Sequence, residues 1–255
     1  MKLHNQAALV TGASRGIGRA IARALAAEGA AVAVNYRSSR EDALGVVKEI
    51  EEAGGRAVAL EADVSDATAA RDLVAAAKEA LGGLHVLVNN AGITDNGLIW
   101  DMAPDGWWEV MRVNFGGAYH CTNAAADGLM GQRRGAIVNI SSVMGERGWA
   151  GQSNYSASKG ALNAFTRSTA IELARFGVRV NGVLGGIVPT DLVGDVLAKD
   201  GGRGMKKQVP MRTFADPRQI ASVVTFLAGP DASYVTGELV QVDGGLTSQL
   251  GIGHP

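Results

Sequence analysis

The sequence predicts a single α/β domain with a doubly wound, seven-stranded parallel sheet and helices on both faces. Short apolar segments typical of strands alternate with longer segments of helical pattern, and no linker interrupts the alternation. Right-handed crossovers return the chain to the same end of the sheet, so consecutive strands run parallel. The predicted strands span residues 6–11, 31–36, 56–61, 84–89, 135–141, 178–184 and 238–242.

Composition favours one globular domain. The 255 residues are 47% hydrophobic and 19% charged, which is enough to bury one large core. The formal net charge is -1 and the basic residues are scattered, so a general binder of nucleic acid or of membrane surfaces is not expected. We expect one domain over residues 1–255, with a nucleotide-binding half over about 1–135 and a catalytic and substrate-binding part over about 136–255.

Targeting segments, cysteines and histidines narrow the class further. The N-terminal segment lacks a long apolar stretch with a cleavage site, and no apolar run approaches the roughly 18 residues that span a bilayer, so we expect a cytoplasmic protein. Cys121 is the only cysteine, which excludes an intrachain disulfide and predicts a small buried apolar residue. No metal site is expected, because the histidines are widely separated: His4, His85, His120 and His254.

A glycine-rich segment joins the first predicted strand to the helical pattern over residues 19–27. It reads TGASRGIG from Thr11 to Gly18. Missing side chains at such a junction let backbone N–H groups and the positive helix end approach a pyrophosphate. The spacing G-x-x-x-G-x-G is less common than G-x-G-x-x-G, and taken alone it also fits a structural turn. The expected cofactor contacts here are Gly12, Ser14, Arg15, Gly16, Ile17 and Gly18.

The end of the second predicted strand indicates which dinucleotide is bound. A site for NAD usually places an acidic residue here, on the adenosine ribose, but the segment from Asn35 to Ser39 has no carboxylate. Arg37 and Arg15 could instead neutralise a 2′-phosphate, with Asn35 beside them. The sequence therefore predicts NADP(H); the alternative is that both arginines are only solvated.

Two later loops also follow predicted strands, where α/β folds bind ligands. Asp63 and Val64 follow the third strand, where they could meet an adenine ring. Asn90, Ala91 and Gly92 follow the fourth. Asn and Gly are common in ordinary turns, so Asn90 alone favours a structural role.

Tyr155 and Lys159 are four positions apart and share one face of a predicted helix. A tyrosine with its usual pKa of about 10 gives up its proton poorly near neutral pH. An ammonium at about 4 Å, in an effective dielectric of about 20, stabilises a phenolate by roughly 4 kcal/mol, which is about three pKa units before desolvation opposes it. We therefore predict that Lys159 lowers the pKa of Tyr155 and makes it a proton donor.

Ser141 and Ser142 end the fifth predicted strand. Strand alternation points them in opposite directions, so only one can face the chemistry. A Ser-His-Asp set and the motif G-x-S-x-G are both missing around them, which argues against a serine hydrolase. Hydrogen bonding to a carbonyl oxygen is the better role for the serine that faces the site.

Taken together and in order, these motifs closely resemble the classical short-chain dehydrogenase/reductase family, especially its 3-oxoacyl-acyl carrier protein (β-ketoacyl) reductase-like branch. The resemblance runs nearly end to end and also implies a Rossmann-type fold. Its serine stands 13 positions before its tyrosine, which selects Ser142. The matching motifs are the segment 11–18, Asp63-Val64, Asn89-Asn90-Ala91-Gly92, Asn114, Ser142, Tyr155 with Lys159, and Val242-Asp243-Gly244-Gly245.

The resemblance implies a role for each member of a catalytic tetrad. Tyr155 would give a proton to a carbonyl oxygen, and Ser142 would hydrogen-bond that oxygen. Lys159 would lower the pKa of Tyr155 and bind the nicotinamide ribose, and Asn114 would hold a water that joins Lys159 to solvent. Tyr155 and Lys159 would thus also contact the cofactor, whose nicotinamide supplies the hydride.

After the sixth predicted strand the sequence departs from the family pattern. The family usually has a Pro-Gly pair and then a threonine, but Gly185 takes the proline position here. Gly186 and Thr190 still match. We expect the nicotinamide contacts of Gly186, Val188 and Thr190 to survive in a more mobile loop.

The residues that would shape the substrate pocket and the partner surfaces are less specific. An apolar wall is expected from Val143, Met144, Trp149, Ile187, Val188 and Met205, although each could equally lie in the core or between subunits. Related reductases carry basic residues that dock an acidic acyl carrier protein near the positions of Arg133, Arg134 and Arg175, and a solvated basic edge explains these three almost as well. The segment 198–204 favours a lid.

The leading prediction is an enzyme that reduces a ketone to a secondary alcohol with NADPH. Its leading substrate is a 3-oxoacyl thioester on a carrier protein. The alternative within the same class is an oxidoreductase of a free small alcohol, sugar, cyclic ketone or polyketide intermediate. A catalytically silent nucleotide-binding scaffold is disfavoured by the complete tetrad. The resemblance also implies a homotetramer that uses the predicted long helices over residues 104–130 and 154–176.

Overall fold

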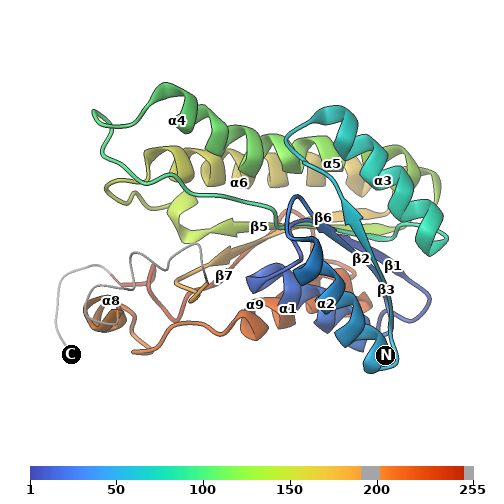
Figure 1. The fold of residues 1–255 in the computed structure, drawn as a ribbon. Coiled ribbons are helices and arrows are strands. Elements are labelled where there is room, and N and C mark those ends of the chain that lie inside the picture. Colours follow the sequence, from blue (N-terminus) through green and yellow to red (C-terminus); the bar gives the residue numbers. More distant parts are fainter. Residues whose placement is uncertain (191–201, 250–255) are drawn as a thin grey trace.

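A computed structural model describes residues 1–190 and 202–249. Its seven strands form one parallel sheet in the order β3-β2-β1-β4-β5-β6-β7 (Figure 1). The prediction of a doubly wound, seven-stranded parallel sheet is confirmed. The strands are β1 (Ala7–Val10), β2 (Ala31–Tyr36), β3 (Arg56–Glu61), β4 (Val86–Asn89), β5 (Gly135–Ser142), β6 (Val178–Gly185) and β7 (Leu239–Val242).

Helices cover both faces of the sheet. Figure 1 shows α1, α2 and α9 on one face and α3, α4, α5 and α6 on the other. The helices are α1 (Gly16–Ala27), α2 (Arg40–Glu52), α3 (Ala67–Leu81), α4 (Pro104–Met111), α5 (Gly117–Gly131), α6 (Ser153–Ala174), α8 (Arg203–Gln208) and α9 (Pro217–Ala228). Short turns are η1 (Arg112–Gly116), η2 (Val143–Gly145) and η5 (Pro230–Ala232). No helix in the described ranges combines the length and apolar character needed to cross a membrane.

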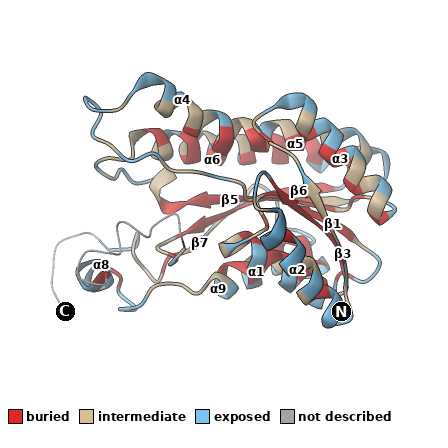
Figure 2. Ribbon diagram, in the orientation of Figure 1, coloured by how far each residue is buried: buried red, intermediate tan, exposed pale blue. Residues whose placement is uncertain are grey.

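Two apolar clusters lie on the two sides of the sheet. Successive residues of β1 alternate between them: Ala8 and Val10 pack with α1 and α9, whereas Ala7 and Leu9 pack with α3 and α5. The central strands are buried between the two layers of helices, whereas the edge strands β3 and β7 are partly exposed (Figure 2). A parallel strand covered on both faces has no polar side, which is why these segments are continuous apolar runs in the sequence.

The chain reverses its direction across the sheet at β1. After β1 it adds β2 and β3 on one side, then returns to place β4 on the other. Such a switch point opens a crevice at the carboxyl ends of the strands. Thr11 closes the base of this crevice: its N–H donates to Val88 O at 3.0 Å, and its Oγ1 accepts from the N–H groups of Asn90 and Ala91 at 2.9 and 3.0 Å.

Cys121 lies inside the helical layer on α5. Its side chain has no exposed surface, and burial raises the pKa of its thiol to about 12. A buried thiol that stays protonated near neutral pH is a poor nucleophile. The prediction of a small buried apolar residue is confirmed.

Candidate active site

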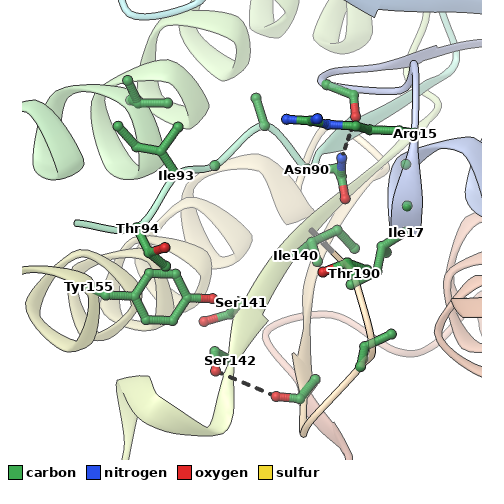
Figure 3. Close-up of a pocket in the computed structure, with 18 of the residues that line it drawn as sticks. Arg15, Ile17, Asn90, Ile93, Thr94, Ile140, Ser141, Ser142, Tyr155 and Thr190 are labelled. Carbon is green, nitrogen blue, oxygen red and sulfur yellow. Dashed lines mark hydrogen bonds between the residues drawn. The ribbon is translucent and has the colours of Figure 1, made fainter. Parts of the chain in front are cut away.

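A cleft with a volume of about 530 Å³ runs along the carboxyl ends of the central strands, and Figure 3 shows part of it. It extends from Arg37 and Asp63 at one end to Ser142 and Tyr155 at the other. All the residues predicted to contact a cofactor line it, as do Met144, Trp149, Ile187 and Met205. The sequence motifs, widely separated along the chain, thus meet in one place.

The glycine loop is shaped to bring backbone close to a ligand. Gly12 and Gly16 have φ of +59° and +56°, a region that side chains disfavour. A Cβ added to Gly18 would lie 2.5 Å from Asn90 Nδ2 and closer still to the Gly12 carbonyl oxygen. The first backbone N–H groups of a helix have no partner within it, and no side chain caps those of α1. These features fit a pyrophosphate at the start of α1.

Two asparagines hold the glycine loop from below. Asn35 is buried; its Oδ1 accepts from Gly12 N at 3.1 Å, and its Nδ2 lies 3.2 Å from Leu60 O and Ala62 O. Asn90 Nδ2 donates to the carbonyl oxygens of Thr11 and Gly12, both at 2.9 Å. Both side chains line the cleft, but their polar groups bond the loop itself. Asn90 thus supports the loop, and its predicted contact with a cofactor stays a prediction.

At the predicted adenosine end of the cleft, Asp63 lies beside Arg37, a contact that the sequence analysis did not anticipate. Asp63, from the end of β3, lies with Oδ2 3.8 Å from Arg37 Nη1, and both side chains are partly exposed. Partial burial raises the pKa of Asp63, but hydrogen bonds from Ser65 and the charge of Arg37 outweigh it and hold that pKa below its ordinary value. Arg37 therefore faces a competing anion inside the protein.

Tyr155 and Lys159 meet at the opposite end, one turn apart on α6. Lys159 Nζ lies 5.6 Å from the centroid of the Tyr155 ring and donates to Ile140 O at 2.8 Å. Only 4% of Lys159 is exposed, and burial lowers its pKa to about 8. The ammonium remains mostly charged at neutral pH.

The pKa of Tyr155 moves in the direction opposite to the prediction. Burial raises it to about 12, and a hydrogen bond with Ser142 lowers it by less. The predicted lowering by Lys159 does not offset burial, because the ammonium lies over the ring face and bonds the backbone of Ile140 rather than the phenol oxygen. Tyr155 thus keeps its proton throughout the neutral range.

Ser142 is the serine that faces the phenol, as the family spacing implied. Its hydroxyl is near enough to the phenol to lower the pKa of Tyr155, accepts from Met144 N at 3.1 Å and lies 3.5 Å from Gly185 O. Ser141 instead bonds Asn163 on α6. Figure 3 shows the Tyr155 hydroxyl pointing from its helix toward the end of β5.

Asn114 braces the site from a buried position outside the cleft lining. It lies in η1, a π-helical turn, and is 1% exposed. Its Nδ2 donates to Ile93 O at 3.0 Å and Ser158 Oγ at 3.1 Å, and its Oδ1 accepts from Ile93 N at 2.8 Å. Both amide protons are therefore used within the protein. Single π-helical turns are common at functional sites.

Known proteins share both the sequence pattern and this architecture. Residues 12–247 match the family model described as Enoyl-(Acyl carrier protein) reductase. The chain is 43% identical over 241 residues to a 3-oxoacyl-(acyl-carrier-protein) reductase FabG of Staphylococcus aureus, covering 94% of this chain and 98% of that protein. It is 42% identical over 242 residues to a 3-oxoacyl-(acyl-carrier-protein) reductase of Synechocystis, covering 94% and 96%.

The chain belongs to the short-chain dehydrogenase/reductase family. A solved putative short-chain alcohol dehydrogenase of Sinorhizobium meliloti matches it with a TM-score of 0.94 and 38% identity, over 98% of this chain and 99% of that one. A gluconate 5-dehydrogenase of Burkholderia cenocepacia, solved with NADP and tartrate, matches with a TM-score of 0.92 and 32% identity over 98% of both chains. The protein is thus an NAD(P)-dependent oxidoreductase acting on CH–OH and C=O groups.

Gly185, where this short-chain dehydrogenase/reductase departs from the family pattern, is the last residue of β6. A Cβ on Gly185 would make only ordinary contacts, the nearest at 3.7 Å from Ile220 Cδ1. A Cβ on Gly186 would lie 2.7 Å from the Cα of Asp243. The loop after β6 therefore requires glycine at Gly186 and has room for a side chain at Gly185.

The substrate end differs from the sequence prediction at Val143. This side chain is 1% exposed and packs on Leu184 in a small core cluster, because η2 turns it away from the cleft. Two polar residues that the sequence analysis missed, Thr94 and Gln152, line the cleft instead. Gln152 precedes Tyr155 by three positions and Thr94 follows the loop after β4, so their places beside known motifs could have identified them.

The arginines predicted to dock a carrier protein lie away from this region. Arg133, Arg134 and Arg175 are at the amino ends of β5 and β6, with Arg133 Nη2 donating to Arg175 O at 3.0 Å. They thus lie at the amino ends of these strands, whereas the cleft lies at the carboxyl ends. Residues 198–201 of the predicted lid lie outside the described residues; residues 202–204 are the cap and first turn of α8.

Proposed function

We propose that this protein reduces a ketone to a secondary alcohol with NADPH, and that its substrate is a 3-oxoacyl group on an acyl carrier protein. The observation that carries the proposal is the meeting of Ser142, Tyr155 and Lys159 in a cleft whose glycine loop fits a dinucleotide phosphate. Bound NADPH would supply the hydride.

The protein's own residues would orient the ketone and supply the proton. Because its pKa is about 12, Tyr155 is protonated near neutral pH and would donate the proton that the carbonyl oxygen accepts. Ser142, which lies near enough to the phenol to lower the pKa of Tyr155, would hydrogen-bond the same oxygen as negative charge develops there. The charged Lys159 would stabilise the phenolate left behind and hold the nicotinamide ribose.

Proton return to Tyr155 would pass through Lys159 and a water near Asn114. The side-chain protons of Asn114 are occupied by Ile93 and Ser158, so its remaining acceptor groups would hold that water. The same bonds keep the π-helical turn in place beside α6.

The preference for NADPH would come from Arg37 and Arg15 at the 2′-phosphate. A doubly charged phosphate is a stronger partner for Arg37 than the single carboxylate of Asp63 at 3.8 Å. The solved gluconate 5-dehydrogenase that contains NADP supports the choice. Competition from Asp63 would make the preference moderate.

The carrier-linked substrate is supported by the 43% identity to the Staphylococcus aureus reductase. The apolar side chains of Met144, Trp149, Ile187 and Met205 suit the acyl part of such a substrate. A carrier docked at Arg133 and Arg175 would be one strand length, about 26 Å, from the cleft of the same chain. Such docking would serve the cleft best within an oligomer.

We propose a homotetramer formed through α4, α5 and α6. Trp108, Tyr119 and Ile171 on these helices are exposed apolar side chains. Their burial in an interface would remove unfavourable contact with water.

The second candidate function is oxidoreduction of a free hydroxy acid or sugar. The solved gluconate 5-dehydrogenase at a TM-score of 0.92 favours it. A polar substrate would use Thr94 and Gln152 in the cleft.

A substrate panel tests the assignment. Initial rates of NADPH oxidation would be compared for a 3-oxoacyl carrier protein, the same acyl group on a small thiol, and 5-ketogluconate, each repeated with NADH. The proposal expects the highest kcat/KM with the carrier-linked substrate and with NADPH. A higher kcat/KM for 5-ketogluconate would establish the second candidate, and equal rates with NADH would contradict the cofactor assignment.

A further inference from the structure

A buried polar contact outside the tetrad joins β5 to α6 at the turn that carries Lys159. Ser141 Oγ lies 2.6 Å from Asn163 Oδ1 and 3.3 Å from the backbone oxygen of Lys159. Ser141 and Asn163 are 5% and 4% exposed. The Lys159 ammonium bonds the carbonyl oxygen of Ile140, the residue before Ser141. Strand and helix are thus joined by several contacts next to the reacting pair.

The turn after β5 presses on the same part of α6. A Cβ added to Gly145 would lie 2.7 Å from the carbonyl carbon of Lys159 and 2.8 Å from Asn163 Nδ2. Among the described residues, Asn163 Nδ2 is also one of the few buried polar groups without a hydrogen-bond partner. An unpartnered buried amide lowers stability, and such groups often have a functional reason. For Asn163 the functional reason would lie at its Oδ1, which accepts from Ser141 Oγ.

We propose that Ser141 and Asn163 form a positioning pair that fixes the position of the Tyr155–Lys159 turn of α6 relative to β5. The inference rests on the function proposed above. Neither residue needs to touch substrate. Ser141 reaches both the Lys159 backbone and the next turn of the helix, so it limits sliding and rotation of α6 on the strand. A displacement of about 1 Å in a catalytic group can cost about a hundredfold in rate.

The ionisation of Lys159 reports on this arrangement. Burial lowers its pKa from 10.5 to about 8, and no charged side chain of the described residues contributes to the shift. Its titratable neighbour is Tyr155 on the same helix; β5 and η2 present hydroxyl and backbone groups. A loosened helix turn would let water reach the ammonium, which favours the charged form and raises the pKa.

The experiment compares Ser141→Ala, Asn163→Ala and their double variant with Thr166→Val as the matched control. Thr166 is also buried on α6 and accepts from Asn139 of β5 at 2.8 Å, one turn beyond Asn163. Replacing Thr166 should therefore weaken the packing of α6 on β5 at a place away from Lys159. Lys159 would be titrated by NMR of isotope-labelled lysine without added cofactor, with its signal assigned by its loss in Lys159→Met. Turnover, NADPH affinity and thermal unfolding would be measured for each variant.

The positioning pair predicts that Ser141→Ala and Asn163→Ala each raise the Lys159 midpoint by at least about half a unit and lower kcat about tenfold. NADPH affinity should stay within about twofold, and the double variant should be no worse than the single ones, because the two residues act as a unit. Thr166→Val should lose thermal stability but keep the wild-type midpoint and kcat.

The inference is overturned if the Lys159 midpoint is unchanged in both single variants, or if Thr166→Val moves it equally. Asn163→Ala keeps the test available should Ser141→Ala fail to fold. A wild-type protein that reduces no ketone would contradict the proposed function, while the titration would still decide the positioning role.

Discussion

The nucleotide end of the cleft is formed mainly by backbone, and the reacting end mainly by side chains. At the nucleotide end the chain presents backbone, with Gly12 and Gly16 at positive φ and no space for a side chain at Gly18. At the reacting end it presents side chains, and Ser142 and Lys159 are themselves buried. One end should therefore be most sensitive to added atoms and the other to removed ones.

Charge follows the same division. Arg37 and Asp63 are partly exposed, so water and salt weaken their interaction. Lys159 is dry, and burial brings its pKa down to about 8. A cofactor would thus be held by many weak, solvated contacts, whereas the proposed proton transfer would depend on a single buried charge, that of Lys159, whose pKa is about 8.

The largest effect on cofactor affinity should come from adding one methyl group at the nucleotide end. Gly18→Ala forces a Cβ against the Gly12 carbonyl and Asn90, and such overpacking costs about 2 kcal/mol, equivalent to about thirtyfold in NADPH affinity. Gly45→Ala on α2 is the control, since nothing lies within 4 Å of its added Cβ, and it should raise stability by about 0.5–1 kcal/mol. Calorimetric titration with NADPH and thermal unfolding check both. An unchanged affinity in Gly18→Ala would erase the distinction between the two ends.

The next effect is on pH dependence and belongs to the reacting end. Below pH 8 Lys159 is charged and supports phenolate formation; above it the charge is lost, so kcat/KM for reduction should fall about tenfold per pH unit. Tyr155, with a pKa of about 12, keeps its proton over this range and adds no decline of its own.

Lys159→Arg identifies the group responsible for that decline. A guanidinium stays charged at every accessible pH, so this variant should be slower but should lose the decline above pH 8. The check is the pH profile of kcat/KM in both proteins. A decline that persists unchanged in Lys159→Arg would assign it to another group.

The smallest effect should come from the exposed charges. Arg37→Ala removes one partly exposed partner of the 2′-phosphate and should reduce the ratio of NADPH to NADH affinity by about threefold to tenfold. Asp63→Asn removes the competing carboxylate, so it should raise the same ratio slightly. Affinities at low and high salt check both changes. Opposite signs would mean that the phosphate binds elsewhere.

The sequence predicted the sheet well because its strands are covered on both faces and form uninterrupted apolar runs. It also predicted which segments meet at the cleft, since parallel strands bring their carboxyl ends to one edge. Motif spacing sufficed to distinguish Ser142 from Ser141 before any contact was known.

Contacts that depend on register could not be predicted in the same way. The meeting of Arg37 with Asp63 follows from the pairing of β2 with β3. The turn that sends Val143 into the core is a local feature without a sequence signal. The direction of the Tyr155 pKa shift depends on how completely packing excludes water, which motif spacing does not reveal.

Tyr155→Phe tests the central claim most directly, in single turnovers of ketone reduction with saturating NADPH, beside Tyr234→Phe, whose side chain is fully exposed. The account predicts that Tyr155→Phe lowers the rate constant about a thousandfold or more, with NADPH affinity within about twofold of wild type. Tyr234→Phe should behave as wild type. A Tyr155→Phe protein that reduces the ketone at the wild-type rate would contradict the assignment of the phenol as proton donor.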